Sequence, residues 1–271
     1  SLFDFFDGYA WHLDERPLRA DNEINPDVLG YIFEKYINQK EMGAYYTKED
    51  ITDYIGKNTI IPFLFDQVKR VYPKAFGNES WIWNFLKQSG DTYIYDAVKK
   101  GIPEKIDLYE DLFADLPDEI KAGFLPELEK EICHEIAPDS NKKHLWEIRK
   151  CWNQKAPEEI ALPTETFREL IERRKRYAEI KAKIESEPYN GGITEINDFI
   201  TFNLNIRQFT QDILEHIPDA DFIRHFYKAL QSVTILDPTC GSGAFLFAAM
   251  NILEPFYETC IERMEQFTAE E

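Results

Sequence analysis

The feature that most constrains the fold is a short apolar run that leads into a glycine-rich turn and then a helix. Residues 233–237 read Val-Thr-Ile-Leu-Asp, a run typical of a strand buried on both faces of a parallel sheet. The following turn contains Gly241 and Gly243, and helical apolar spacing begins at Ala244. A strand, a glycine turn and a helix in this order open the nucleotide-binding α/β folds. We therefore expect an α/β fold for the C-terminal part of the chain.

The rest of the 271-residue chain shows mainly the apolar spacing of helices. One helix is expected to start with Asn25 as N-cap and Pro26 as first helical residue. Two more are expected to start at Thr47 and Thr166, each of which has an acidic residue three positions later, as in a capping box. Another is expected over about 219–231. The predicted organisation is a helical N-terminal segment over 1–65, a mostly helical insertion over 66–205, and the start of the α/β domain over 206–271.

The glycine turn carries a specific chemical signal. Gly241 and Gly243 permit close approach of a ligand to the backbone, and the helix that follows offers unpaired N–H groups. The turn has only G-x-G and no following Lys, so it lacks the full dinucleotide and nucleoside-triphosphate signatures. Asp237 places a carboxylate beside the turn, which suits a ligand with cationic character such as S-adenosylmethionine.

Two short motifs carry a resemblance to a known family. Residues 237–245, Asp-Pro-Thr-Cys-Gly-Ser-Gly-Ala-Phe, resemble motif I of the amino-group DNA methyltransferases, written D-P-x-x-G-x-G-x-F. Residues 43–47, Gly-Ala-Tyr-Tyr-Thr, resemble motif X of the gamma-class adenine methyltransferases, which precedes motif I. The wider stretches 30–66 and 162–207 look like large methylases of restriction-modification and BREX-type phage-exclusion systems. The resemblance implies a Rossmann-like methyltransferase domain, with an unusually long insertion between the motifs.

The resemblance also implies an activity, a cofactor and a set of site residues. The activity is transfer of a methyl group from S-adenosylmethionine to adenine N6 at specific DNA sites, with the base flipped out of the duplex. The cofactor-binding residues carried over from the motifs are Tyr46, Thr47, Asp237, Pro238, Gly241, Gly243 and Phe245. The catalytic D/N-P-P-Y/F motif of the family is absent, so no catalytic residue is assigned. We expect an N-terminal fragment of a larger enzyme, inactive alone, and the sequence leaves open whether the parent also carries a nuclease domain.

The charge of the chain restricts how it can meet DNA. The formal net charge is -19, and such a surface repels nucleic acid at long range. The strongest basic cluster, Arg173, Arg174, Lys175 and Arg176, is a candidate contact with DNA phosphates, or a solvated helix face. We expect double-stranded DNA as a partner mainly through regions beyond residue 271, together with other subunits of a restriction or phage-defence system.

The apolar runs and the cysteines of the sequence limit the cellular setting and the metal sites that can be expected. The sequence contains no apolar run near the ~20 residues that a membrane helix needs, and its four cysteines form no C-x-x-C pair. A reducing, cytoplasmic setting is expected. A zinc set of Cys133, His134, His144 and Cys151 matches no standard spacing, so no metal is expected. The alternative to an enzyme is a helical DNA-docking or protein-interaction module in which the glycine turn has no cofactor role.

Overall fold

The computed structural model describes residues 8–11, 23–24, 47–104, 106, 109–122, 149–187, 190–238, 240, 241 and 243–270. The chain forms two compact units, one made of Ser1–Val68 with Ala220–Glu271 and the other of Lys69–Asp219. The helix expected from Asn25 lies outside the described residues. The domain borders expected after residues 65 and 205 stay a prediction.

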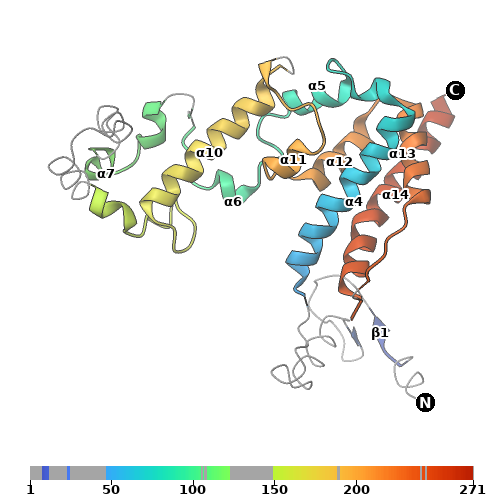
Figure 1. Ribbon diagram of the computed structural model, residues 1–271, viewed down its shortest axis with the longest axis horizontal. Coiled ribbons are helices and arrows are strands. Elements are labelled where there is room, and N and C mark those ends of the chain that lie inside the picture. The colour runs from blue at the N-terminus through green and yellow to red at the C-terminus, as the bar shows by residue number, and fades with distance from the viewer. Residues whose placement is uncertain are drawn as a thin grey trace. The chain divides into compact units, whose positions relative to one another are not determined.

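The first unit is built on three helices, which Figure 1 shows together. They are α4 (Glu49–Val71, its last residues in the second unit), α13 (Ala220–Ser232) and α14 (Ala244–Glu270). The starts of α13 and α14 agree with the sequence prediction. Two-residue strands β1 (Ala10–Trp11) and β2 (Glu23–Ile24) pair in parallel, Ala10 with Glu23 and Trp11 with Ile24.

Aromatic rings hold the three helices together. Helix α13 buries Phe222, Phe226 and Leu230 at helical spacing. The Phe226 ring meets the edge of Phe65 from α4 at 5.5 Å and of Phe256 from α14 at 6.3 Å between ring centroids. These separations and crossed orientations are the preferred ones for aromatic pairs. The core of this unit therefore joins segments from both sides of the 69–219 region.

The expected α/β fold is wrong for the described part of the chain, which is mainly helical. Residues 233–237 have no regular secondary structure, and Ile235 and Leu236 are 39% and 86% exposed. Among the described residues, β1 and β2 form the only sheet. A strand needs a hydrogen-bonded neighbour, and no described strand pairs with 233–237. The prediction of a buried, paired strand from this apolar run is therefore wrong.

The second unit is a set of helices and short helical turns. They are η1 (Pro73–Phe76), α5 (Trp81–Gln88), α6 (Asp96–Lys99), η2 (Tyr109–Phe113), α7 (Asp118–Ala122), η3 (Arg149–Asn153), α10 (Phe167–Glu185), α11 (Asp198–Thr201) and α12 (Ile206–His216). In its core the ring of Phe209 stacks on Phe199 at 4.3 Å and meets the edge of Tyr93 at 5.1 Å. Among the described residues of both units, no helix combines the length and the apolar character needed to cross a bilayer.

Phenol–carboxylate hydrogen bonds tie distant parts of this unit. The Tyr93 hydroxyl donates to Asp212 at 2.9 Å, and burial raises the pKa of this phenol. The Tyr72 hydroxyl donates to Asp219 at 2.9 Å, so a bond joins a residue near the start of the unit to its last residue. Closely spaced ends are typical of a segment inserted between two parts of another unit.

The expected helix start at Thr166 is confirmed. Thr166 is the N-cap of α10, with a complete capping box to Glu169. The Thr166 side chain accepts from the Glu169 N–H, and the Glu169 carboxylate accepts from the Thr166 N–H at 2.8 Å. These bonds pair backbone donors that a helix start otherwise leaves without a partner inside the helix.

Loss of this cap should destabilise the second unit. We predict that Thr166→Ala lowers the free energy of unfolding by about 1 kcal/mol, because a cap acceptor is removed. Urea unfolding followed by circular dichroism measures the change. Thr201→Ala, at an exposed threonine in α11, is the control and should change stability by less than about 0.5 kcal/mol. Equal effects of the two substitutions would show that the capping box contributes nothing.

Candidate functional site

The candidate site lies where the segment 233–243 leads into helix α14. Asp237 is half-buried, and Pro238 is exposed in the turn that follows it. Gly241 is exposed, and a Cβ placed on it would meet no atom of the described residues within 4 Å. Open space around this backbone leaves room for a ligand to approach it closely.

Gly243 joins the turn to the helix. Its φ of +87° lies in the left-handed region that favours glycine. Its carbonyl accepts the N–H of Phe247 at 2.9 Å, the first helical hydrogen bond of α14. The backbone N–H groups of the first turn of α14 therefore point toward the glycine turn. Phe245, half-buried, lies in that turn of helix.

Helices α4 and α14 bring Thr47, the last residue of the motif before α4, and the glycine turn to one end of the first unit. Figure 1 shows the helices running in the same direction, with their N-terminal ends together. They meet at Gly56, where a Cβ would lie 2.9 Å from Cδ1 of Ile252. Thr47 precedes Gly56 by nine residues, and Gly243 precedes Ile252 by nine. Because the helices are parallel, Thr47 and Gly243 lie at a similar level along their axes, about 13 Å from the contact at 1.5 Å per residue.

The N-terminal end of α4 differs in detail from the sequence prediction. The Lys48 carbonyl accepts the N–H groups of Ile51 and Thr52 at 3.0 and 3.1 Å, so Lys48, rather than Thr47, occupies the N-cap position. Thr47 is exposed immediately before it. Tyr46 lies outside the described residues. Thr47 is thus a surface residue at the end of the helix pair, and its contact with a cofactor stays a prediction.

Two of the four cationic residues proposed to contact DNA are used inside the second unit. Arg174 is fully buried, and its guanidinium donates to both oxygens of Asp115 and to the carbonyls of Leu112 and Gly101. Arg173 donates to the carboxylate of Glu165 and to the carbonyls of Val98, Lys100 and Ile160. These contacts correct the prediction for Arg173 and Arg174, because their donors are directed into the protein rather than toward phosphate.

Both arginines change the acidity of their partners. Hydrogen bonding by Arg174 holds the pKa of Asp115 below its ordinary value of 3.8. Burial opposes ionisation of Glu165, but hydrogen bonds from Arg173 and from the Leu162 N–H outweigh it and lower the pKa below 4.5. Both carboxylates therefore stay ionised at neutral pH, as the paired guanidiniums require.

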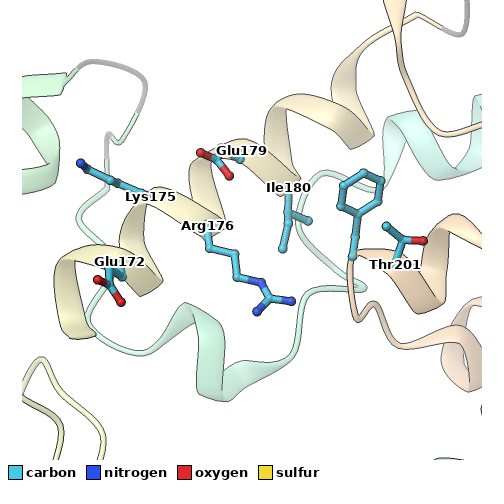
Figure 2. A pocket seen from close by; sticks show the side chains of 7 residues that line it. Glu172, Lys175, Arg176, Glu179, Ile180 and Thr201 are labelled. Carbon is cyan, nitrogen blue, oxygen red and sulfur yellow. The ribbon is translucent and has the colours of Figure 1, made fainter. Parts of the chain in front are cut away.

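Lys175 and Arg176 instead line a surface hollow of about 420 Å³ beside α10. Figure 2 shows Arg176 and Ile180 pointing to the same side of the helix. The remaining lining residues are Glu172, Glu179, Thr201 and Phe202. Two carboxylates accompany the two cations, so this face of α10 has a mixed charge that is typical of a solvated helix.

The possible zinc set cannot be assembled from the described residues. Cys133, His134 and His144 lie outside them, and Cys151 is half-buried, with its Sγ 3.9 Å from the carbonyl oxygen of Glu119. Within the described ranges no cluster of His, Cys, Asp and Glu could hold a metal ion.

One residue at the candidate site was missed by the sequence analysis. Gly56 lies in the interior of a 23-residue helix, where glycine costs about 1 kcal/mol relative to alanine. Such a glycine commonly has a packing reason, and here the reason is the close contact with Ile252. The glycine within a predicted helix could be recognised in the sequence, but the sequence could not show which helix packs against it.

Comparison with known proteins gives one partial match. A stretch of the chain is similar to a protein of Methanocaldococcus jannaschii that is named as a type II restriction enzyme and methyltransferase. The sequences are 41% identical over 77 residues, which is 26% of this chain and 6% of that protein. The chain thus spans a small fraction of the length of the curated relative it matches. No family model matches the chain, and no solved structure matches it.

Removal of the buried guanidinium should unfold the second unit more easily. We predict that Arg174→Ala lowers the free energy of unfolding by about 2–4 kcal/mol, because two carbonyls and a carboxylate lose their donor. The remaining exposure of Asp115, 42% of its side chain, limits the loss. Arg176→Ala, at an exposed position on the same helix, is the matched control and should change stability by less than about 0.5 kcal/mol. Urea unfolding that does not distinguish the two variants would contradict the buried role.

Stability should also depend on pH through these carboxylates. Since the folded-state pKa values of Asp115 and Glu165 are lowered, their contribution is fully present above about pH 5 and is lost as the pH falls through the lowered values. In Arg174→Ala, the pKa of Asp115 should return toward its ordinary value. The free energy of unfolding of this variant should therefore fall less steeply below about pH 5 than that of the unsubstituted protein. If the free energies of unfolding of the two proteins fall in parallel below about pH 5, the pairing of Arg174 with Asp115 is refuted.

Proposed function

We propose that this chain contributes the first part of the cofactor site of a restriction-modification DNA methyltransferase that modifies the N6 of adenine. The M. jannaschii protein named as a restriction enzyme and methyltransferase supports the general class. The observation that carries the proposal is the placement of both motifs, Thr47 and the Gly241–Gly243 turn, at one end of parallel helices α4 and α14. The adenine specificity rests on the resemblance of these motifs to gamma-class methyltransferases.

The residues at the turn fit S-adenosylmethionine. The space around Gly241 admits the ligand to the backbone, and the first-turn N–H groups of α14 can donate to its carboxylate. The Asp237 carboxylate can pair with its ammonium or sulfonium group. Thr47, Pro238 and Phe245 contribute a hydroxyl and apolar surface near the same end. The proposed cofactor set is therefore Tyr46, Thr47, Asp237, Pro238, Gly241, Gly243 and Phe245.

Binding and orientation are the roles that we assign to these residues. S-adenosylmethionine supplies an electrophilic methyl group, and attack by an amine needs a close, in-line approach. A carboxylate held beside the turn and N–H donors held by a helix orient the ligand without moving during the reaction. We assign none of the described residues to the adenine. Of the four basic residues expected to contact DNA, only Lys175 and Arg176 remain candidates for that contact.

Gly243 provides the most selective test of the cofactor site. We predict that Gly243→Val abolishes binding of S-adenosylmethionine by the protein that contains this chain, because a branched side chain resists φ of +87° and occupies the space beside the backbone. Gly90→Val is the matched control: Gly90 also has a positive φ, +63°, and open space around it, but lies in the second unit. Equilibrium binding of radiolabelled cofactor measures the difference. Normal affinity in Gly243→Val would overturn the proposal in favour of an interaction module.

Asp237 tests the cationic character of the ligand. Asp237→Ala should weaken cofactor binding by about 1.5–3 kcal/mol, the range for a hydrogen bond to a charged group. Isothermal titration calorimetry gives the affinity, and Asp212→Asn, at a carboxylate of the second unit that accepts from Tyr93, serves as control for general effects of charge. A larger loss in the control than in Asp237→Ala would contradict a direct role of Asp237.

A further inference from the structure

Gly56 combines two properties that helix formation alone does not explain. It lies in the interior of α4 in a helical conformation, so no turn requires it there. It is also buried against α14, and a Cβ would come within 2.9 Å of Ile252 Cδ1. Ile252 itself is completely buried, so this side chain has little room to give way. Any residue larger than alanine at position 56 must therefore move the two helices apart or displace Ile252.

We propose that Gly56 is a positioning residue for the candidate cofactor site. The close helix contact that it permits sets the distance between the N-terminal end of α4 and the turn before α14. Thr47 and Gly243 lie at matching distances along their helices from this contact. A displacement at Gly56 is thus transmitted along α4 to Thr47, while the internal geometry of the glycine turn is unchanged. The role in cofactor binding rests on the proposed function, but the helix geometry can be tested without the cofactor.

Native cysteines allow the geometry to be measured by cross-linking. Cys240 is exposed in the turn, whereas Cys260 is completely buried and burial raises the pKa of its thiol to about 12. With Cys133 and Cys151 replaced by serine, Thr47→Cys and Cys240 become the reactive pair for bis-maleimidoethane. Phe63→Cys is the matched control. It is an exposed position on α4, sixteen residues beyond Thr47 and so about 24 Å further along the helix.

The decisive comparison adds substitutions at the helix contact. We expect efficient cross-linking from Thr47→Cys, little from Phe63→Cys, and a yield reduced several-fold when Gly56→Val is added to Thr47→Cys. Ile252→Ala removes three carbons from the opposing side chain, and Gly56→Val adds three. The Gly56→Val and Ile252→Ala pair should therefore restore the yield, even where Gly56→Val alone lowers stability. Gly56→Ala adds a single carbon that meets only the end of the Ile252 side chain. This variant should therefore keep most of the cross-linking yield.

Cofactor affinity is then measured on the same variants by equilibrium binding. The Kd for S-adenosylmethionine should rise about tenfold in Gly56→Val and recover in the double variant, because a site tolerates misplacement of only about 0.5 Å. If the folded protein gives the same cross-linking yield from Thr47→Cys with and without Gly56→Val, the positioning role is overturned. An unchanged Kd in that variant does so too. If the protein without the Gly56 substitution binds no cofactor, the proposed function fails. The cross-linking yields alone then decide whether Gly56 sets the position of Thr47.

Discussion

The contact of Phe226 with both Phe65 and Phe256 is the interaction on which the rest of the first unit depends. These rings come from helices on either side of the 69–219 region. Their packing brings the segment before this region against the segment that follows it. Without that core, Gly56 would not reach Ile252, and the N-terminal end of α4 would have no fixed relation to the glycine turn. A cofactor site shared by two motifs so far apart in sequence requires such a core.

Sequence patterns predicted the helices well and the sheet poorly. The capping box at Thr166 and the start of α14 at Ala244 follow from local rules, because nearby backbone groups decide where a helix begins. A strand is different, since its stability comes from neighbours. The apolar run at 233–237 predicted a buried strand, but in the structure it forms no strand and is largely exposed. Local composition cannot say whether such a neighbour lies beside it.

The basic cluster shows the same limit for function. Four consecutive cationic residues predicted a surface that contacts DNA, yet α10 turns Arg173 and Arg174 inward to Glu165 and Asp115. Helical periodicity gives the directions of neighbouring side chains relative to one another, but the partners that receive them come from distant segments. The candidate cofactor residues stay a prediction, and to them the structure adds the contact of Gly56 with Ile252, through which we propose that Thr47 and the glycine turn are positioned.

Hydrogen–deuterium exchange of this protein with and without S-adenosylmethionine tests the central claim most directly. If the glycine turn and the N-terminal end of α4 bind one ligand, the backbone amides of 241–247 and of 47–52 should exchange more slowly together when cofactor is present, while α10 in the second unit keeps its rate. Protection of neither segment, or protection confined to α10, would contradict the account.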